Sequence, residues 1–339
     1  MHRRPCLPVV ALAALAVVLC WTGVRADGGL TGAAGAARAA RAQLVGPAVL
    51  AFVAVVFALE RRWPARPRPA LARGHVHDAV YLGLYALVVV PLTTLTGAGF
   101  ATLVRHLAPW VVLPRVAAVP RWAFVVLALV AMDAANWLAH WTNHRVDGLW
   151  RLHAVHHAQP ELSVLTSFRA HPLVHVSFLV ASVPALVLVG NGVVPAHVIV
   201  VYICLATLPH ANLRWGAGPI GRSAGRVLVT PASHRLHHAD HGRIDVNLGT
   251  ILTVWDAASG RAVRVGPDHV PGPTGLAGHP IAVEQDSMRP THLRTLATQL
   301  VEPFVSRPTD ERTGSRRADD GPRPGQRRVA RRLEPARDG

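Results

Sequence analysis

Long apolar stretches with almost no charged residues are the feature that most constrains the fold of this chain. They cover residues 44–59, 79–104, 123–138 and 176–209. About 20 apolar residues in a helix cross the hydrocarbon core of a bilayer, so such stretches are typical of membrane-spanning helices. Hydrophobic residues make up 51% of the chain and charged residues 16%, which favours a membrane protein over a soluble one. The sequence therefore predicts an all-α fold, a polytopic membrane helical bundle.

Arginines and a turn signal predict the orientation of this bundle. The linker after the first stretch carries Arg61, Arg62, Arg66, Arg68 and Arg73. Cytoplasmic loops carry an excess of positive charge, so this linker is expected on the cytoplasmic side. The 176–209 stretch contains Gly190-Asn191-Gly192, which predicts a hairpin that dips into the membrane and returns. The topology places the histidine-rich segments in a helical cap on the cytoplasmic face, and we expect a bacterial inner (cytoplasmic) membrane.

The rest of the chain divides by composition. We expect a signal segment or a first membrane helix at 1–26, a loop at 27–43, membrane helices at 44–121, a peripheral segment at 263–305 and a disordered basic tail at 306–339. The net charge of +16 comes from arginine alone. Such an excess could indicate nucleic-acid binding, but in a membrane protein it more often marks cytoplasmic loops and tails. We therefore expect no nucleic-acid partner.

Histidine is concentrated in two copies of one pattern and one looser pair. These are His153-x-x-His156-His157, His234-x-x-His237-His238 and His140-x-x-x-His144. Residues three and four apart share a helix face, so each cluster can direct its imidazoles at one point. We interpret the three clusters as one polynuclear metal site. Asp133 lies on the same stripe as His140 and is expected to accept a hydrogen bond from a ligating imidazole, which would fix its tautomer.

The types of residue in these clusters narrow the choice of metal. Neutral imidazole suits zinc, copper, iron and nickel. Structural zinc usually recruits cysteine, and none of the cysteines lies near the clusters. The H-E-x-x-H motif of zinc proteases is absent, and so are the Glu-x-x-His pairs of soluble di-iron bundles. An all-histidine, two-metal site at a membrane face remains.

With further motifs between and after the clusters, the chain resembles a known family. These motifs are Leu149-Trp150-Arg151-Leu152 before His153, Arg169-Ala170-His171-Pro172, His210-Ala211-Asn212, Asn247-x-Gly249 and Trp255-Asp256. In order and spacing they are similar to the fatty acid hydroxylase/sterol desaturase superfamily of membrane di-iron enzymes. The resemblance covers about residues 122–262 and implies that this range is a fatty acid hydroxylase-like catalytic domain.

The resemblance implies two iron ions, O2 activation, and hydroxylation or desaturation of an unactivated C–H bond in a lipid. The implied ligands are His140, His144, His153, His156, His157, His234, His237 and His238, with His210 as a ninth. Gly216-x-Gly218-x-x-Gly221 matches the dinucleotide fingerprint, but it follows a membrane hairpin and not the strand that a nucleotide site needs. With no flavin or haem motif either, the reaction implies a separate electron donor, a ferredoxin or cytochrome with its reductase. The resemblance assigns no catalytic residue beyond the metal ligands.

Several positions depart from the family pattern. Ala206 stands where some members have another histidine, Val174 replaces a frequent acidic residue, and Leu248 replaces an aromatic one. The candidates for additional ligands or for hydrogen-bond partners of ligands are Asp133, His171, His175, Asn212, Asp240, Asn247 and Asp256.

A different class of function stays open, namely a membrane metal-binding protein or metal transporter without redox turnover. Transporters place ionisable residues near the middle of the bilayer, along a path. The clusters here are expected outside the spans, at one face. This position favours the enzyme.

Overall fold

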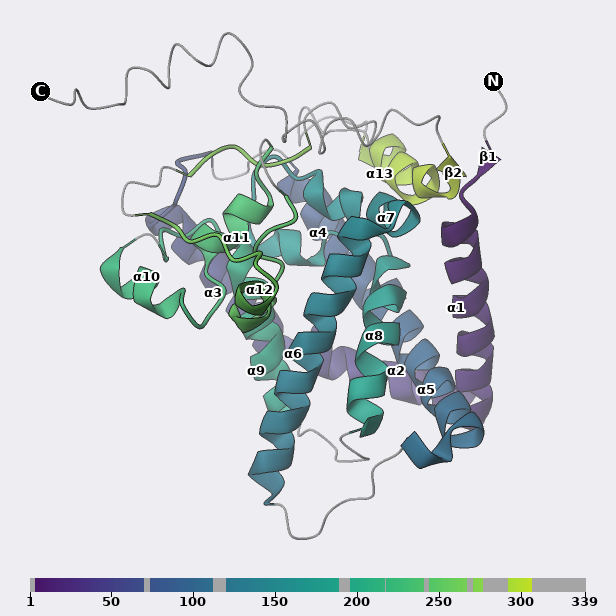
Figure 1. Ribbon diagram of the computed structural model, residues 1–339. Coiled ribbons are helices and arrows are strands. Elements are labelled where there is room, and N and C mark those ends of the chain that lie inside the picture. The colour runs from purple at the N-terminus through teal and green to yellow at the C-terminus, as the bar shows by residue number, and fades with distance from the viewer. Residues whose placement is uncertain are drawn as a thin grey trace, which may run out of the picture.

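The computed structural model describes residues 4–69, 74–111, 120–188, 196–216, 218–240, 244–266, 271–276 and 292–306, and their regular structure is almost entirely helical (Figure 1). The α-helices are α1 Leu7–Ala26, α2 Leu30–Leu44, α3 Pro47–Arg62, α4 His75–Leu84, α5 Val90–Leu107, α6 Arg121–Arg145, α7 Asp147–His157, α8 Val174–Leu188, α9 Ala196–Thr207, α10 Pro219–Ala224, α11 Pro231–His237, α12 Val254–Ala258 and α13 His292–Val301. A π-helical turn, Tyr85–Val89, joins α4 to α5, and 3₁₀ turns lie at Pro109–Val111, Val164–Phe168, Leu208–His210 and Glu302–Phe304. The strands β1 Arg4–Pro5 and β2 Val305–Ser306 pair antiparallel.

Four helical segments in the described residues are long and apolar enough to cross a membrane. They are Leu7–Ala26, Leu30–Arg62, His75–Leu107 and Arg121–Arg145. The predicted all-α membrane bundle is confirmed at this level. The predicted loop at 27–43 is wrong, because α2 occupies Leu30–Leu44. Its alanines have the highest helix propensity, and this outweighs the glycines that suggested a loop.

Helix α1 packs closely against α5, and glycine makes this approach feasible. A Cβ atom at Gly23 would overlap the carbonyl group of Leu95, and one at Gly99 would overlap that of Leu19. Small residues at such crossings let membrane helices approach to backbone contact. The other end of α1 packs through Cys6 and Val9 into a buried cluster. Helix α1 lies in the segment expected to be a signal segment or a first membrane helix, and both alternatives stay predictions.

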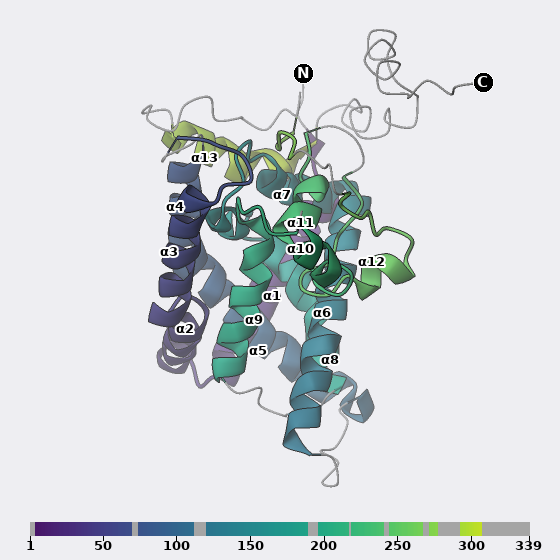
Figure 2. The ribbon, with the colours of Figure 1, turned by 90° about the vertical axis from the view of Figure 1, so that its left-hand side faces the viewer.

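Helices α8 and α9 occupy the predicted 176–209 hairpin, although its Gly190-Asn191-Gly192 tip lies outside the described residues. Both views show α7, α11 and α13 at one end of the bundle, from which α6, α8 and α9 extend (Figures 1 and 2). The hairpin therefore starts and ends on the side that carries the histidines. That this is the cytoplasmic side stays a prediction.

Residues 292–306 return to the same end of the molecule (Figure 1). The Tyr81 hydroxyl donates to Oε1 of Gln299 at 3.0 Å, and Arg151 donates to the Val305 carbonyl at 2.9 Å. The predicted peripheral segment thus fastens to α4 and α7 through the part of it that the structure describes. The predicted disordered tail lies outside the described residues beyond Ser306.

Candidate metal centre

All nine histidines predicted as ligands converge at the capped end of the bundle in two adjacent groups. The five-histidine cluster contains His140, His144, His153, His157 and His237. The four-histidine cluster contains His156, His210, His234 and His238. Within each group, one ring nitrogen from every histidine lies within 4.8 Å of the others, and either group could hold a metal ion.

The doubled sequence pattern does not direct each triplet at a single point as expected, because each triplet is divided between the clusters. On α7, His153 and His157 share a face and enter the five-histidine cluster, while His156 enters the other. At α11 the division is reversed, since His234 and His238 join the four-histidine cluster and His237 joins the five. The clusters are adjacent, and the rings of His157 and His238 stack with centroids 4.4 Å apart.

Hydrogen bonds fix the tautomers of several of these rings. Nδ1 of His140 lies 2.8 Å from the Leu248 carbonyl oxygen, and Nδ1 of His237 lies 3.1 Å from that of Val246. Nδ1 of His156 makes the same contact with the Arg169 carbonyl at 3.0 Å. A carbonyl oxygen only accepts, so each Nδ1 carries the proton and each Nε2 presents a lone pair.

Two such lone pairs face each other in the four-histidine cluster. The Ser167 hydroxyl donates to the Thr207 carbonyl, so it accepts from Nδ1 of His210 at 2.9 Å. Nε2 of His210 is then unprotonated, and it lies 3.0 Å from the unprotonated Nε2 of His156. Two lone pairs at this distance repel unless a cation lies between them. This geometry is what a metal ligand set requires.

Burial keeps the imidazoles neutral. It lowers the pKa of His156 to about 3, and it lowers the pKa values of His153, His157, His237 and His238 well below their usual range, with neighbouring histidines adding to the effect. Neutral imidazole is the form that binds metal.

The unsatisfied ring atoms also fit a metal. Buried ring nitrogens without a hydrogen-bond partner include Nε2 of His140, His144, His153, His157, His237 and His238. Buried polar atoms are otherwise almost always paired. Two ligands on opposite sides of an ion lie about 4 Å apart, since metal–nitrogen bonds are about 2.0–2.1 Å. The 4.8 Å spread therefore needs only a small contraction.

The five-histidine cluster is held by the loop between α11 and α12. This loop supplies the Val246 and Leu248 carbonyls that orient His237 and His140. Asp256 holds the loop by accepting from the backbone N–H groups of Leu248 and Gly249 at 2.9 and 2.8 Å.

Asn247, between the two carbonyls, has a φ of 51°, a left-handed conformation that is costly for a residue other than glycine. Its side chain donates to the Ser233 and Val263 carbonyls and accepts from the Val263 N–H group. The predicted candidates Asn247 and Asp256 thus act on the shape of the loop.

Asp133 differs from the prediction, because it accepts from no ligating imidazole. Its carboxylate accepts from the backbone N–H groups of Ile251 and Leu252 and from the Trp255 indole, at 2.9–3.1 Å. The backbone N–H donors belong to the loop that precedes α12. Asp133 therefore ties α6 to the loop that orients His140.

The four-histidine cluster is held by a different segment, residues 163–169. Ser167 accepts from His210, and the Arg169 carbonyl accepts from His156. The Arg169 guanidinium is fully buried and donates to the Val155 carbonyl at 3.0 Å. The chain between α7 and α8 thus fixes two of the four rings.

The remaining predicted candidates lie outside both clusters. Nε2 of His171 lies 3.0 Å from the Leu300 carbonyl. His175 packs its ring edge against Tyr85, with centroids 5.4 Å apart. The Asn212 side chain hydrogen-bonds to the backbone of Arg66 and accepts from the Arg235 guanidinium at 2.9 Å. The backbone N–H group of Asp240 donates to the Pro273 carbonyl.

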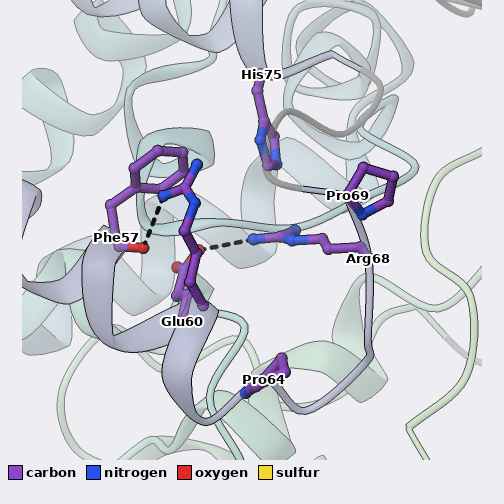
Figure 3. A pocket seen from close by; sticks show the side chains of 7 residues that line it. Phe57, Glu60, Pro64, Arg68, Pro69 and His75 are labelled. Atoms are coloured by element: carbon purple, nitrogen blue, oxygen red, sulfur yellow. Dashed lines mark hydrogen bonds and ion pairs between the residues drawn. The ribbon is translucent and has the colours of Figure 1, made fainter.

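Two acidic residues that the sequence reasoning missed lie beneath the 163–169 segment. Glu60, at the end of α3, pairs with Arg68 at 2.7 Å (Figure 3). Asp78, in α4, pairs with Arg169 at 3.3 Å, and both side chains are fully buried. A signal existed, since each acid lies at the boundary of an apolar stretch, where burying a carboxylate is costly unless it is paired.

A cavity of about 270 Å³ opens beside both clusters. His140, His153, His156, His210 and His234 line one part of it. Phe168, Phe178, Ile203 and Ala206 line another part, together with the half-buried His175. Cavities near this size take small ligands or part of a larger one. This cavity suits a segment of an apolar chain placed against both candidate metal sites.

Residues 125–261 match the model of the fatty acid hydroxylase family. This part of the chain is therefore similar to that family. The matched residues lie within the 122–262 range indicated by the motifs and include all nine histidines of the two clusters.

Two curated proteins are similar to part of this chain. An ornithine lipid hydroxylase of Rhizobium tropici is 29% identical over 145 residues, which cover 40% of this chain and 40% of the relative. An alkylglycerol monooxygenase of Danio rerio is 28% identical over 135 residues, which cover 40% of this chain and 29% of the relative. The chain thus spans less than half the length of the curated relatives it matches. No solved structure matches the chain.

Proposed function

We propose that this protein is a membrane di-iron oxygenase that hydroxylates a C–H bond of a lipid. One observation carries the proposal: histidines of both clusters and apolar side chains line the same cavity. The family match and the two relatives, which are named for lipid oxidation, support it. Desaturation stays the alternative outcome of the same chemistry.

Two irons bound by the nine histidines would supply O2 activation for C–H oxidation. The balanced reaction is R–H + O2 + 2 electrons + 2 H⁺ → R–OH + H2O. The electrons come from a separate donor, a ferredoxin or cytochrome with its reductase.

The contribution of the chain itself is positioning and exclusion of water. The rings of Phe168 and Phe178 and the side chain of Ile203 would hold an alkyl segment against the cavity wall that carries His153 and His156. An apolar lining of this kind excludes water and places one C–H bond at the metals, which is the main role of the protein in such chemistry.

The substrate class proposed is a membrane lipid that enters from the bilayer with its polar end near the cap. The relatives are named for an ornithine lipid and an alkylglycerol, both of which combine alkyl chains with a polar end. We place the capped end on the cytoplasmic side of a bacterial inner membrane.

Transport of metal ions is less well supported. His140 and His144 lie in the last two turns of α6, and the other clusters follow outside the long helices. A transport site would be expected midway along a span.

Comparative lipidomics of a deletion strain tests the proposal. The strain should lack one hydroxylated lipid, and wild-type protein should restore it, while His156→Ala and His237→Ala should not. An unchanged lipid profile in the deletion strain, together with metal uptake by vesicles that contain the protein, would support the transport alternative instead.

A further inference from the structure

The two candidate metal sites are supported by different parts of the chain. The loop that orients His140 and His237 is held by Asp133 and Asp256. Both acids lie within residues 125–261, which match the family. Glu60 and Asp78 lie outside this range, on α3 and α4, and both contact the chain that orients the four-histidine cluster.

Asp78 holds the segment 163–169 from below. It accepts from the Thr166 hydroxyl at 2.9 Å, from the Gln159 amide at 2.7 Å and from the Arg169 guanidinium at 3.3 Å. The backbone carbonyl of the same Arg169 accepts from Nδ1 of His156. The buried carboxylate therefore fixes the residue that orients this ring.

Glu60 binds two backbone segments that lead to His210 and to the residue that orients it. Its Oε1 accepts from the backbone N–H groups of Val164 at 2.7 Å and of Asn212 at 3.1 Å. Val164 opens the turn that carries Ser167, which orients His210, and Asn212 follows His210 by two residues. Arg68 donates to Oε2 of Glu60 and also to the Glu161 carbonyl, which braces the same stretch (Figure 3).

We propose that Glu60 and Asp78 are positioning residues for the four-histidine site alone. Helices α3 and α4 then position the four-histidine site, and the loop between α11 and α12 positions the five-histidine site. The proposal rests on the proposed two-metal function. Partners that orient ligating histidines typically change metal affinity by about 10–100-fold when they are removed. Cavity residues His156, His210 and His234 belong to this site, so α3 and α4 would set the geometry of the ion nearer the lipid segment.

The test is metal binding by the full-length protein in detergent, measured as Co²⁺ bound per chain and by the visible spectrum of the bound ion. Wild type should bind two ions. Asp78→Asn and Glu60→Gln should each lower the Co²⁺ affinity of the four-histidine site by about 10–100-fold and leave the affinity of the five-histidine site unchanged. Asp256→Asn should instead lower the affinity of the five-histidine site. Asp147→Asn, an exposed acid on the helix that carries His156, is the matched control and should bind two ions as wild type does.

Second substitutions identify which ion is lost. In the Asp78→Asn background, His144→Ala should remove the remaining tight ion, and His238→Ala should change little. A purely structural role would weaken both ions together and lower the helical circular dichroism signal. Asp78→Glu, which keeps the charge, should recover part of the affinity.

The outcomes separate this proposal from the proposed function. Two ions of unchanged affinity in Asp78→Asn and Glu60→Gln, or an equal loss at both sites, would overturn the assignment of these acids while leaving a two-metal enzyme intact. A folded wild-type protein that binds no ion would overturn the proposed function itself.

Discussion

The five-histidine and four-histidine clusters contain the same kind of ligand at adjacent positions, yet they differ in surroundings. Three members of the four-histidine cluster line the cavity, against two of the five. A site with fewer protein ligands keeps coordination positions open, as catalytic metal sites do. The four-histidine site therefore suits the encounter with substrate, while the five-histidine site is closer to saturation.

The two clusters also differ in the parts of the chain that hold their histidines in place. A loop within the family-matched residues, with the strained Asn247 between two ligand-orienting carbonyls, holds the five-histidine cluster. Buried ion pairs that reach into the membrane helices hold the four-histidine cluster. The residues that match the family therefore contain every candidate metal ligand but not every group that orients these ligands.

Removal of a ligand should give the largest effect, and it should do so at either cluster. We expect His156→Ala and His237→Ala each to abolish lipid hydroxylation, because each takes one imidazole from a different site. Product formation by mass spectrometry and iron per chain are the measurements. Full turnover by either variant would break the idea that both clusters serve one reaction.

Asp256→Asn should weaken the five-histidine site by about 10–100-fold in metal affinity. The amide keeps the shape but loses one acceptor for the Leu248 and Gly249 N–H groups, so the Leu248 carbonyl no longer holds His140 as firmly. A Co²⁺ titration measures this change. A lower metal affinity at the four-histidine site instead would contradict the assignment of Asp256 to the five-histidine site.

Filling the cavity should separate substrate binding from metal binding. Ala206→Phe places a ring among the apolar lining and should lower turnover about tenfold or more with two metals still bound. Leu205→Phe is the control, since Leu205 is 44% exposed on the same helix and points away from the core. Equal activity of both variants would mean that this cavity does not hold the substrate.

Acid should destabilise the metal-free protein. Burial holds the pKa of His156 at about 3 in the folded state, against 6.5 for the ordinary value, and lowers the pKa values of His153 and His157 well below 6.5. Between pH 6.5 and about 3 the unfolded chain binds protons that the folded chain does not, so stability falls as pH falls through this range and is unaffected above it.

The measurement is thermal unfolding of the detergent-solubilised, metal-free protein at pH 7.5 and pH 5. We expect a clear drop in Tm at pH 5. An unchanged Tm would show that the buried imidazoles do not take up protons on unfolding.

His171→Ala should have the smallest effect. His171 contacts the Leu300 carbonyl and not a cluster, so its loss should cost about 1 kcal/mol of stability and leave two metals bound. Loss of one bound metal in this variant would place His171 among the ligands, as the sequence left open.

The sequence predicted the membrane-spanning stretches and the nine histidines but not α2 or how the histidines divide. Spacing of three and four residues places His153, His156 and His157 near one another. Tertiary packing, such as that of α7 against α6, decides that His156 joins the other cluster. A one-dimensional pattern gives the ligand candidates, while their partition depends on tertiary contacts.

The groups that orient the ligands were the least predictable. The carbonyls of Val246, Leu248 and Arg169 belong to the backbone, so the side chains carry no direct signal of their role. Asp133 had the right spacing for a contact with a ligand, but its nearest donors come from a loop more than 100 residues later in the chain.

Iron content of the purified full-length protein, together with Mössbauer spectra of the bound iron, tests the central claim most directly. The account predicts two ferrous ions per chain in wild type, with two distinct signals because the sites have five and four imidazole ligands. His238→Ala should lose one signal and His144→Ala the other. A folded, helical wild-type protein that binds fewer than two irons would contradict the account.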